Sequence, residues 1–475
     1  MNIKHKRILV IASSCSVLTM GGYAFIHQKT KKLNILILST CSLRANRLGY
    51  ASGKNTSPYI DKVAQKSFVF KNAFTDKSWS NVSGFLQKIP NSFVQKNGYT
   101  AIGNHGSETG LRKIDFSKNP KRYNGDFFLR LPGLNYQLSP IDYFDYSDDL
   151  KKIKERLLDT SKYPFYIEIH NKVMHLPYGN QFDKYHRPVR YLISPESVKY
   201  IQEYEANYLS TPDRLPFSFF LGNIGKNNVP QVLKVLNINE IQTKKMLNKL
   251  GVPFFVGMLN NKKVIERWKN TKYFSRDLEV IKEMYDYRLK MFDESLKDLI
   301  NLYGNKDLVD NTVIIFTGDH GEAFFEHGLM IHGETVFDEM LNFPLFVKFP
   351  GQVKRLEINQ QFFQAGIVNI AKKIMTGELN KENFNDKIKQ NFSYPFIYSR
   401  TCSNDLRSIR YNNEWKYIID LKKDKKYLYD LKKDPNESLD LLEQRPDISA
   451  FLEENYIMMS SVQKKGKLFH FCNDE

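Results

Sequence analysis

The chain has only four cysteines in 475 residues, and this scarcity excludes a fold held together by a framework of disulfide bonds. Cys15 lies in an apolar amino-terminal segment that we expect to be separate from the folded body. The other three, Cys41, Cys402 and Cys472, allow at most one pair. The fold must therefore depend on a hydrophobic core, and a chain of this length can bury a large one.

The sequence also lacks an arginine-rich helix, a recognisable nucleic-acid-binding module, an internal repeat and a low-complexity linker. Its formal net charge is nevertheless +18, from 70 lysines and arginines against 52 aspartates and glutamates. Because the basic residues are scattered along the whole chain, they indicate a solvated basic surface, and we expect no nucleic-acid partner. An anionic partner stays open: a sulfated or phosphorylated small molecule or glycan, or an acidic lipid surface.

Residues 1–32 have the pattern of an export segment. A basic start is followed by the almost uncharged apolar stretch 8–26 and then by the basic run HQKTKK. Two interpretations stay open: a secretory signal cut after Ala24, or an uncleaved membrane anchor about long enough to span a bilayer. Both predict that the rest of the chain is exported, either to the periplasm or to the outer face of a membrane.

Two continuous apolar runs, Leu33–Leu38 and Val313–Phe316, predict strands that are buried on both faces. The second run ends abruptly in TGDHG, which contains Asp319 and His320. Ligands of open α/β sheets bind at the carboxyl ends of the strands, so these two side chains are candidate ligands. A carboxylate beside an imidazole, with two more histidines shortly after, suits a divalent ion such as Zn²⁺, Mg²⁺, Mn²⁺ or Ca²⁺.

The remaining patterns predict an α/β fold. Apolar residues recur at helical spacing from Leu278 to Ile300, which indicates a long amphipathic helix packed on the sheet, and residues 334–341 look helical. We expect a central, mostly parallel sheet sandwiched by helices, followed by a small C-terminal antiparallel sheet with a helix at 448–459. The expected domains are residues 33–375, with an insertion at about 187–277 that carries no motif, and residues 390–475.

The stretch at residues 313–350, VIIFTGDHGEAFFEHGLMIHGETVFDEMLNFPLFVKFP, resembles the sulfatase-like branch of the alkaline phosphatase superfamily. The resemblance continues in LRANRLG after the first strand, in the following TSP turn, and in LYDLKKDPNE near the C-terminus. It covers most of residues 34–442 except the insertion and implies an alkaline phosphatase-like fold. It further implies that Asp319 and His320 bind a metal ion and that His332 contacts a sulfuryl or phosphoryl group.

Two positions depart from the family pattern. Cys41 stands where the family has a metal-binding Asp, and a thiolate binds Zn²⁺ well but Ca²⁺ or Mg²⁺ poorly, so the site is either shifted toward zinc or lost. Ser80, in SWSNVSG, falls on the position of the nucleophile. Val82 and Gly84 replace the Pro and Arg of the sulfatase maturation pattern, so we expect no formylglycine and a plain serine hydroxyl. The alternative role of Ser80 is a helix N-cap.

Three other histidines lie in segments that also resemble the family. The segment YPFYIEIHNKVMHLPY contains His170 and His175, and the resemblance implies that His175 approaches the substrate oxyanion. His170 and His105 are candidates for further substrate contacts.

The resemblance implies an exported, metal-dependent hydrolase or transferase of sulfuric or phosphoric esters. Ser80 would be the nucleophile, His175 and His332 would steady the transferred group, and Asp319, His320 and Cys41 would hold the ion. The alternative is a non-catalytic protein that keeps the fold and uses a degenerate anion pocket for binding or for scaffolding at the membrane.

Overall fold

A seven-stranded sheet forms the centre of the computed structural model, which describes residues 32–79, 89–103, 129–130, 137–138, 164–171, 174, 269–270, 274–302, 311–401 and 405–465. Its strand order is β11-β2-β10-β7-β1-β6-β3. Strand β10 is antiparallel to both neighbours, and the other pairings are parallel. The mostly parallel sheet predicted from the sequence is therefore confirmed. The strands are β1 (Asn34–Thr40), β2 (Phe68–Phe74), β3 (Thr100–Gly103), β6 (Phe165–Asn171), β7 (Thr312–Gly318), β10 (Leu345–Lys348) and β11 (Leu356–Phe363).

The two apolar runs form the middle of this sheet. Every residue of β1 and β7 is buried, as expected for strands with covered faces. The two strands pair in parallel without a shift, from Asn34 opposite Thr312 to Thr40 opposite Gly318. They therefore end at the same edge of the sheet, which brings the residues after Thr40 next to those after Gly318.

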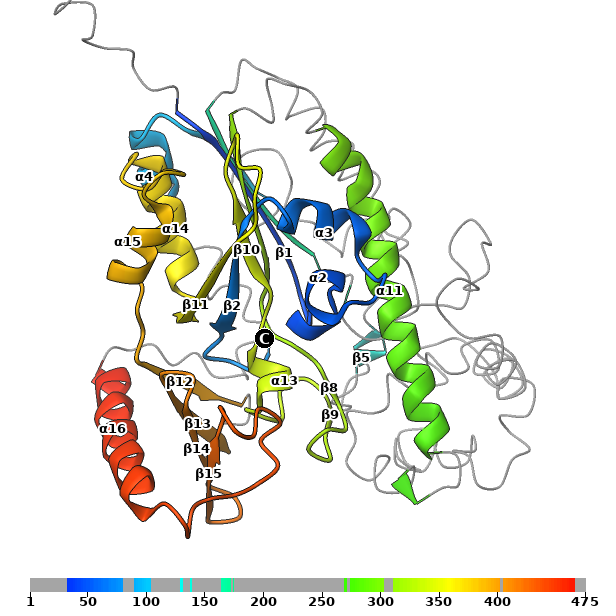
Figure 1. Ribbon diagram of the computed structural model, residues 1–475, viewed down its shortest axis with the longest axis vertical. Helices are drawn as coiled ribbons and strands as arrows, with labels where there is room; N and C mark the ends of the chain where they lie inside the picture. Colours follow the sequence, from blue (N-terminus) through cyan, green and yellow to red (C-terminus); the bar gives the residue numbers. More distant parts are fainter. Residues whose placement is uncertain are drawn as a thin grey trace, which may run out of the picture.

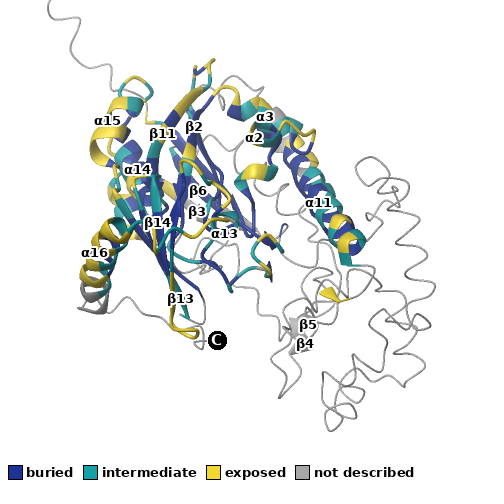
Figure 2. Ribbon diagram, turned by 60° about the horizontal axis from the view of Figure 1, so that its bottom comes forward, coloured by how far each residue is buried: buried dark blue, intermediate teal, exposed yellow. Residues whose placement is uncertain are grey.

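Helices cover both faces of the sheet (Figure 1). On one face, α4 (Asn91–Lys96), α14 (Gly366–Met375) and α15 (Phe384–Asn391) enclose a hydrophobic core with the sheet. On the other face lie α2 (Gly49–Ser52), α3 (Pro58–Ala64) and the long α11 (Phe274–Leu302). Helix α11 includes the predicted Leu278–Ile300, and its Phe292 ring stacks on Phe316 of β7 at 6.5 Å between centroids. Figure 2 shows most of the strands coloured as buried, whereas the outer helices carry exposed positions.

One predicted helix is much shorter than expected. The sequence suggested a helix over residues 334–341, but only α13, Asp338–Leu341, forms. The preceding residues are held in other contacts: the Gly333 N–H donates to the Ser78 carbonyl oxygen at 2.7 Å, and Phe337 has extended φ and ψ. The Phe337 ring stacks on His327 at 3.5 Å between centroids. These tertiary contacts prevent the earlier start of the helix.

A four-stranded antiparallel sheet follows, as predicted for the C-terminal part. It consists of β12 (Phe396–Arg400), β13 (Leu406–Tyr411), β14 (Trp415–Asp420) and β15 (Lys425–Asp430), and α16 (Pro446–Lys465) packs on it. The end of β12 bonds to the chain after β2, since the Arg400 N–H donates to the Asp76 carbonyl oxygen at 3.0 Å. The described residues also include two short hairpins, β4 (Leu129–Arg130) with β5 (Gln137–Leu138) and β8 (Ala323–Phe324) with β9 (Met330–Ile331).

Some predictions lie outside the described residues. These include residues 1–31, with the expected export segment, and almost all of the insertion at 187–277. None of the helices in the described part of the chain is both long and apolar enough to cross a membrane. The domain boundaries stay a prediction.

Buried charges connect α13 to the C-terminal sheet. Asp338 pairs with Arg410 at 2.6 Å and with Lys416 at 2.9 Å, and Lys416 also pairs with Glu437 at 2.7 Å. Lys416 is fully buried, and these two carboxylates are its ion-pair partners. Burial raises the pKa of Glu437 to about 7 against the opposing effect of Lys416.

His327 adds a second contact between the same two regions. Its Nδ1 lies 2.8 Å from Glu339 Oε1, and its Nε2 lies 3.2 Å from the Asn436 carbonyl oxygen. Burial alone would lower the pKa of His327, but the hydrogen bond to Glu339 and the charge of that carboxylate outweigh it, and the pKa is raised. Both ring nitrogens face acceptors, an arrangement that suits the protonated imidazole.

We expect His327→Gln to destabilise the protein in a pH-dependent way. The raised folded-state pKa means that the stabilisation is full below the unfolded pKa and is lost as pH rises through the folded pKa. The loss of unfolding free energy should be about 1 kcal/mol near pH 5.5 and smaller near pH 8.5. Urea denaturation at both pH values measures it, with Lys433→Gln as a surface control. A loss that grows with pH would contradict this account.

Candidate active site

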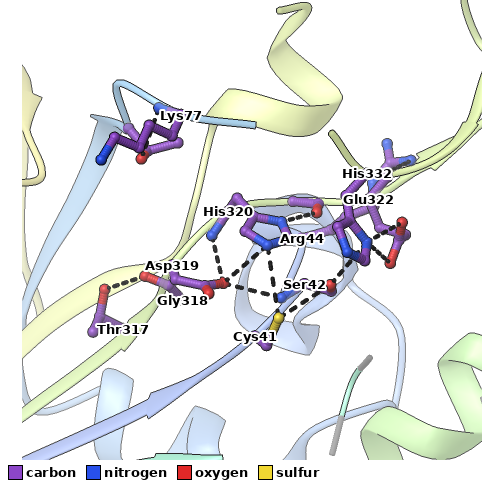
Figure 3. Close-up of polar contacts among 12 residues, drawn as sticks. Cys41, Ser42, Arg44, Lys77, Thr317, Gly318, Asp319, His320, Glu322 and His332 are labelled. Atoms are coloured by element: carbon purple, nitrogen blue, oxygen red, sulfur yellow. Dashed lines mark hydrogen bonds and ion pairs between the residues drawn. The ribbon is translucent and has the colours of Figure 1, made fainter. Parts of the chain in front are cut away.

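Three candidate ligands meet where β1 and β7 end (Figure 3). Cys41 Sγ lies 3.6 Å from His320 Nε2, and that nitrogen lies 3.7 Å from Asp319 Oδ1. One donor atom from each residue falls within 4.8 Å of the other two. Cys41 and His320 are fully buried and Asp319 is 9% exposed, so the group is shielded from bulk water.

The turn after β1 is held in an unusual conformation. Ser42 has φ of +57°, which is uncommon for a residue other than glycine. Its N–H donates to Asp319 Oδ1 at 3.1 Å, and its carbonyl oxygen accepts from the Tyr285 hydroxyl at 2.6 Å. The same hydroxyl accepts from the Arg44 N–H at 3.0 Å. Burial raises the pKa of Tyr285, so its hydroxyl stays protonated and serves both bonds.

His320 is held with one nitrogen toward the other ligands. Its Nδ1 lies 2.7 Å from the Gly321 carbonyl oxygen, which can only accept, so Nδ1 carries the proton. Its Nε2 then presents a lone pair toward Cys41 and Asp319. Burial is the main effect on the pKa of His320 and lowers it, so the ring is neutral at neutral pH. A neutral imidazole is the form that binds metals.

The three donors fit a zinc ion. In a tetrahedral site with Zn–S of about 2.3 Å and Zn–N of about 2.1 Å, the sulfur and nitrogen lie about 3.6 Å apart. The Cys41 Sγ to His320 Nε2 distance is 3.6 Å. Ca²⁺ and Mg²⁺ prefer oxygen ligands, and Cys41 offers none. Without an ion, the same thiol can donate a hydrogen bond to His320 Nε2.

A second histidine lies beside this group. The His332 ring centroid is 4.8 Å from that of His320, and His332 Nδ1 is 3.2 Å from Glu322 Oε1 and 3.4 Å from Ser42 Oγ. Glu322 is fully buried, so its carboxylate holds the ring with the Nδ1 proton toward it. These contacts engage Nδ1 and not Nε2. We did not expect Glu322 from the sequence, although it is the last residue of the DHGE motif.

The chain that leads to Ser80 approaches the same place. Gly333, next to His332, donates its N–H to the Ser78 carbonyl oxygen at 2.7 Å. Lys77 Nζ lies 5.9 Å and the Arg400 guanidinium 5.5 Å from the Trp79 ring centroid, so two cationic side chains flank this segment. Lys77 follows β2 and His320 follows β7. These two strands run in the same direction, so both residues lie at the same edge of the sheet (Figure 3).

Several predicted site residues cannot be placed. Ser80, His105 and His175 lie outside the described residues. The backbone of His170 is described and pairs with Ser39 of β1, two residues before Cys41, but its side chain is not. The structure thus brings together Cys41, Asp319, His320 and His332, and the roles of all the predicted site residues stay predictions.

Comparison with known proteins gives one family. A family model described as Sulfatase matches residues 34–379. The chain is similar to iduronate 2-sulfatase of Mus musculus, with 23% identity over 407 residues that cover 73% of this chain and 64% of the relative. The chain thus spans less than two thirds of that relative's length.

Solved structures share the fold. One was determined in complex with its substrate, D-glucosamine-2-N,6-O-disulfate; it has a TM-score of 0.56 and 14% identity, covering 94% of this chain and 100% of its own. Another is the phosphonate monoester hydrolase of Agrobacterium radiobacter, with a TM-score of 0.56 and 15% identity, covering 90% of this chain and 96% of its own. At such identities the likeness establishes the fold alone.

We expect Tyr285→Phe to destabilise the turn that carries Cys41. The change removes a buried hydroxyl and leaves the Ser42 carbonyl and the Arg44 N–H without their partner, at a cost of about 1–3 kcal/mol. Urea denaturation measures this loss, and Tyr411→Phe in the C-terminal sheet is the matched control. Equal stability of the two variants would show that the hydroxyl does not hold the turn.

Proposed function

Because this chain belongs to the sulfatase family of the alkaline phosphatase superfamily, we propose that it is a metal-dependent hydrolase of sulfuric or phosphoric esters. The observation that carries the proposal is the buried thiol, carboxylate and imidazole group at the adjoining ends of β1 and β7. Burying a thiol, a carboxylate and an imidazole together lowers the stability of the fold unless an ion or a substrate interacts with them.

Cys41, Asp319 and His320 would hold the ion. Proteins of this family generally use a divalent metal, and the thiol favours zinc here. When bound, such an ion lowers the pKa of a nucleophile and neutralises charge on the ester oxygens. The protein supports it by keeping His320 neutral through burial and by fixing its Nδ1 proton on the Gly321 carbonyl oxygen.

Ser80 is our candidate nucleophile. Its position follows from the family resemblance, and the bond from Gly333 to Ser78 supports it, because this bond holds the chain two residues earlier beside His332. In the proposed step, the Ser80 hydroxyl loses its proton as Oγ forms a bond to sulfur or phosphorus, and the leaving oxygen takes up a proton as its bond breaks, so that an alcohol departs. Water then releases the covalent group. No formylglycine is involved, so the attacking group is a serine hydroxyl.

Histidines and cations would stabilise the transferred group. With its Nδ1–H toward the Glu322 carboxylate, the doubly protonated His332 ring can donate its Nε2–H to an oxygen of that group. His175, and with it His170 and His105, are proposed substrate contacts on the family resemblance alone. Lys77 and Arg400 near Trp79 add positive charge next to the site, which favours an anionic ester.

The proposed substrates are sugars that carry sulfate esters, and phosphate esters are the second choice. One structural relative was solved with a disulfated glucosamine, and another is a phosphonate monoester hydrolase. The net charge of +18 suits a polyanionic glycan. We further propose that residues 1–32 export the chain, either as a cleaved signal or as an anchor.

A non-catalytic role is the second candidate, and one observation favours it. Cys41 Sγ is within hydrogen-bonding distance of His320 Nε2, so thiol and imidazole can satisfy each other without an ion. In that case the protein would bind an anionic ligand or act as a scaffold at the membrane.

Turnover separates the two candidates. We expect zinc-loaded full chain to hydrolyse p-nitrophenyl sulfate or p-nitrophenyl phosphate. Ser80→Ala should lower kcat by more than about 100-fold, because the covalent step loses its nucleophile. Ser83→Ala, three residues on, is the matched control and should keep the activity. A wild-type chain that contains zinc but hydrolyses neither ester would favour the non-catalytic role.

Cys41→Asp should change the metal preference. A carboxylate in place of the thiolate restores an oxygen ligand, so we expect weaker Zn²⁺ binding and stronger Ca²⁺ or Mg²⁺ binding. Metal content after dialysis against equimolar mixtures, measured by mass spectrometry, gives the ratio, and Cys472→Asp is the control. An unchanged ratio would show that Cys41 is not a ligand.

A further inference from the structure

Lysines and exposed aliphatic side chains lie at the end of the central sheet opposite the proposed active site. Because β10 is antiparallel to its neighbours, its last residue, Lys348, lies at the edge where β1, β2 and β11 begin. The chain segments at this edge carry lysines and two exposed aliphatic side chains. We call them the basal surface: Lys32, Lys66, Lys348, Val353, Lys354, Leu356 and Lys381.

The lysines of the basal surface are close enough to repel one another. Burial, together with the charges of Lys66 and Lys381, lowers the pKa of Lys348 to about 8. Lys381 Nζ lies 3.5 Å from the place that a Cβ on Gly351 would take, so the lysine reaches across from the loop between α14 and α15. Lys66 and Lys354 are exposed. An anionic partner would relieve this repulsion.

Nearby carboxylates do not cancel this charge. Glu382 lies 3.6 Å from Lys381, but Glu357 already pairs with Arg355 at 2.7 Å, and Glu378 pairs with Lys373 at 2.6 Å. Glu382 thus offsets one basal lysine, but among the described residues no carboxylate forms an ion pair with Lys66, Lys348 or Lys354, which leaves the basal surface positive.

Aliphatic side chains distinguish the basal surface from a purely ionic one. Val353 is 73% exposed and Leu356 is 47% exposed, and both lie in the same segment as Lys354. A polyanionic glycan can bind the lysines, but it has no apolar surface for the aliphatic side chains to contact. The headgroup region of an anionic bilayer accepts both, since lysines bind its phosphates and short apolar groups enter the interface.

The expected export segment ends close to the basal surface in the sequence. The apolar stretch 8–26 is separated from Lys32 by only five residues, 27–31, which reach at most about 20 Å when extended. Lys32 leads directly into β1, at the end of the sheet away from α13 and the C-terminal sheet (Figure 1). If the apolar stretch lies in a bilayer, the basal surface lies close to its headgroups.

We propose that the basal surface docks on an anionic phospholipid bilayer and that the active site faces away from it. The seven residues of β1 separate the two ends by roughly 20 Å or more. The site then meets esters in the surrounding medium, such as sulfated glycans, and not the headgroups of the bilayer that carries the protein. This inference concerns orientation and does not depend on the ester that is cleaved.

Lysine labelling tests the proposal on the full chain. The protein is placed in nanodiscs of phosphatidylcholine alone or with phosphatidylglycerol, treated briefly with a water-soluble N-hydroxysuccinimide ester, and mapped by peptide mass spectrometry. We expect Lys66, Lys348, Lys354 and Lys381 to be labelled several-fold more slowly in the anionic nanodiscs. Lys423 and Lys433, whose side chains are 67% and 86% exposed on the C-terminal sheet, are the internal controls and should not change.

Salt and charge reversal complete the test. Salt at about 1 M should abolish the protection, because it screens charges beyond about 3 Å. Lys66→Glu with Lys354→Glu should abolish the protection of Lys348 and Lys381, whereas Lys423→Glu with Lys433→Glu should leave it intact. Equal labelling in both nanodiscs would overturn the proposal. So would failure of the chain to associate with the anionic nanodiscs, or protection that requires a soluble sulfated polysaccharide.

Discussion

The parallel pairing of β1 with β7 is the constraint on which the rest of the site depends. It aligns Thr40 with Gly318 and thereby places Cys41 beside Asp319, although 277 residues separate Ser42 from Asp319 in the chain. A shift of one residue in this register would turn every buried side chain of one strand to the other face. Burial of both strands therefore fixes the register, and the register fixes which donors meet.

The residues around this pairing hold the donors in place. Ser42 takes a positive φ and bonds to the Asp319 carboxylate and the Tyr285 hydroxyl, so the turn is fixed by both β7 and α11. Glu322 holds His332, and Gly333 connects it to the segment before Ser80. The C-terminal sheet adds the buried charges of Asp338 and Lys416. The contacts of Ser42 and Glu322 therefore hold the donors in place without an ion or a substrate.

The sequence predicted the features that depend on periodicity. Continuous apolar runs predicted β1 and β7, helical spacing predicted α11, and the polar residues after the second run predicted Asp319 and His320 as candidate ligands. Cys41 and His332 were added to them by the family resemblance. Features that depend on the direction of one side chain were not predictable. The sequence does not show that the Glu322 side chain points toward His332. Nor does it show that Lys416, in a strand whose side chains alternate between two faces, is buried beside two carboxylates. The helix expected at 334–341 failed because tertiary bonds override local propensity.

The central claim is that Cys41, Asp319 and His320 hold one metal ion. X-ray absorption at the zinc edge, recorded on the zinc-loaded full chain, tests it most directly because sulfur scatters differently from nitrogen and oxygen. The account predicts one sulfur at about 2.3 Å together with nitrogen and oxygen ligands at about 2.0–2.1 Å. A spectrum with nitrogen and oxygen ligands only, or a chain that retains no zinc, would contradict it.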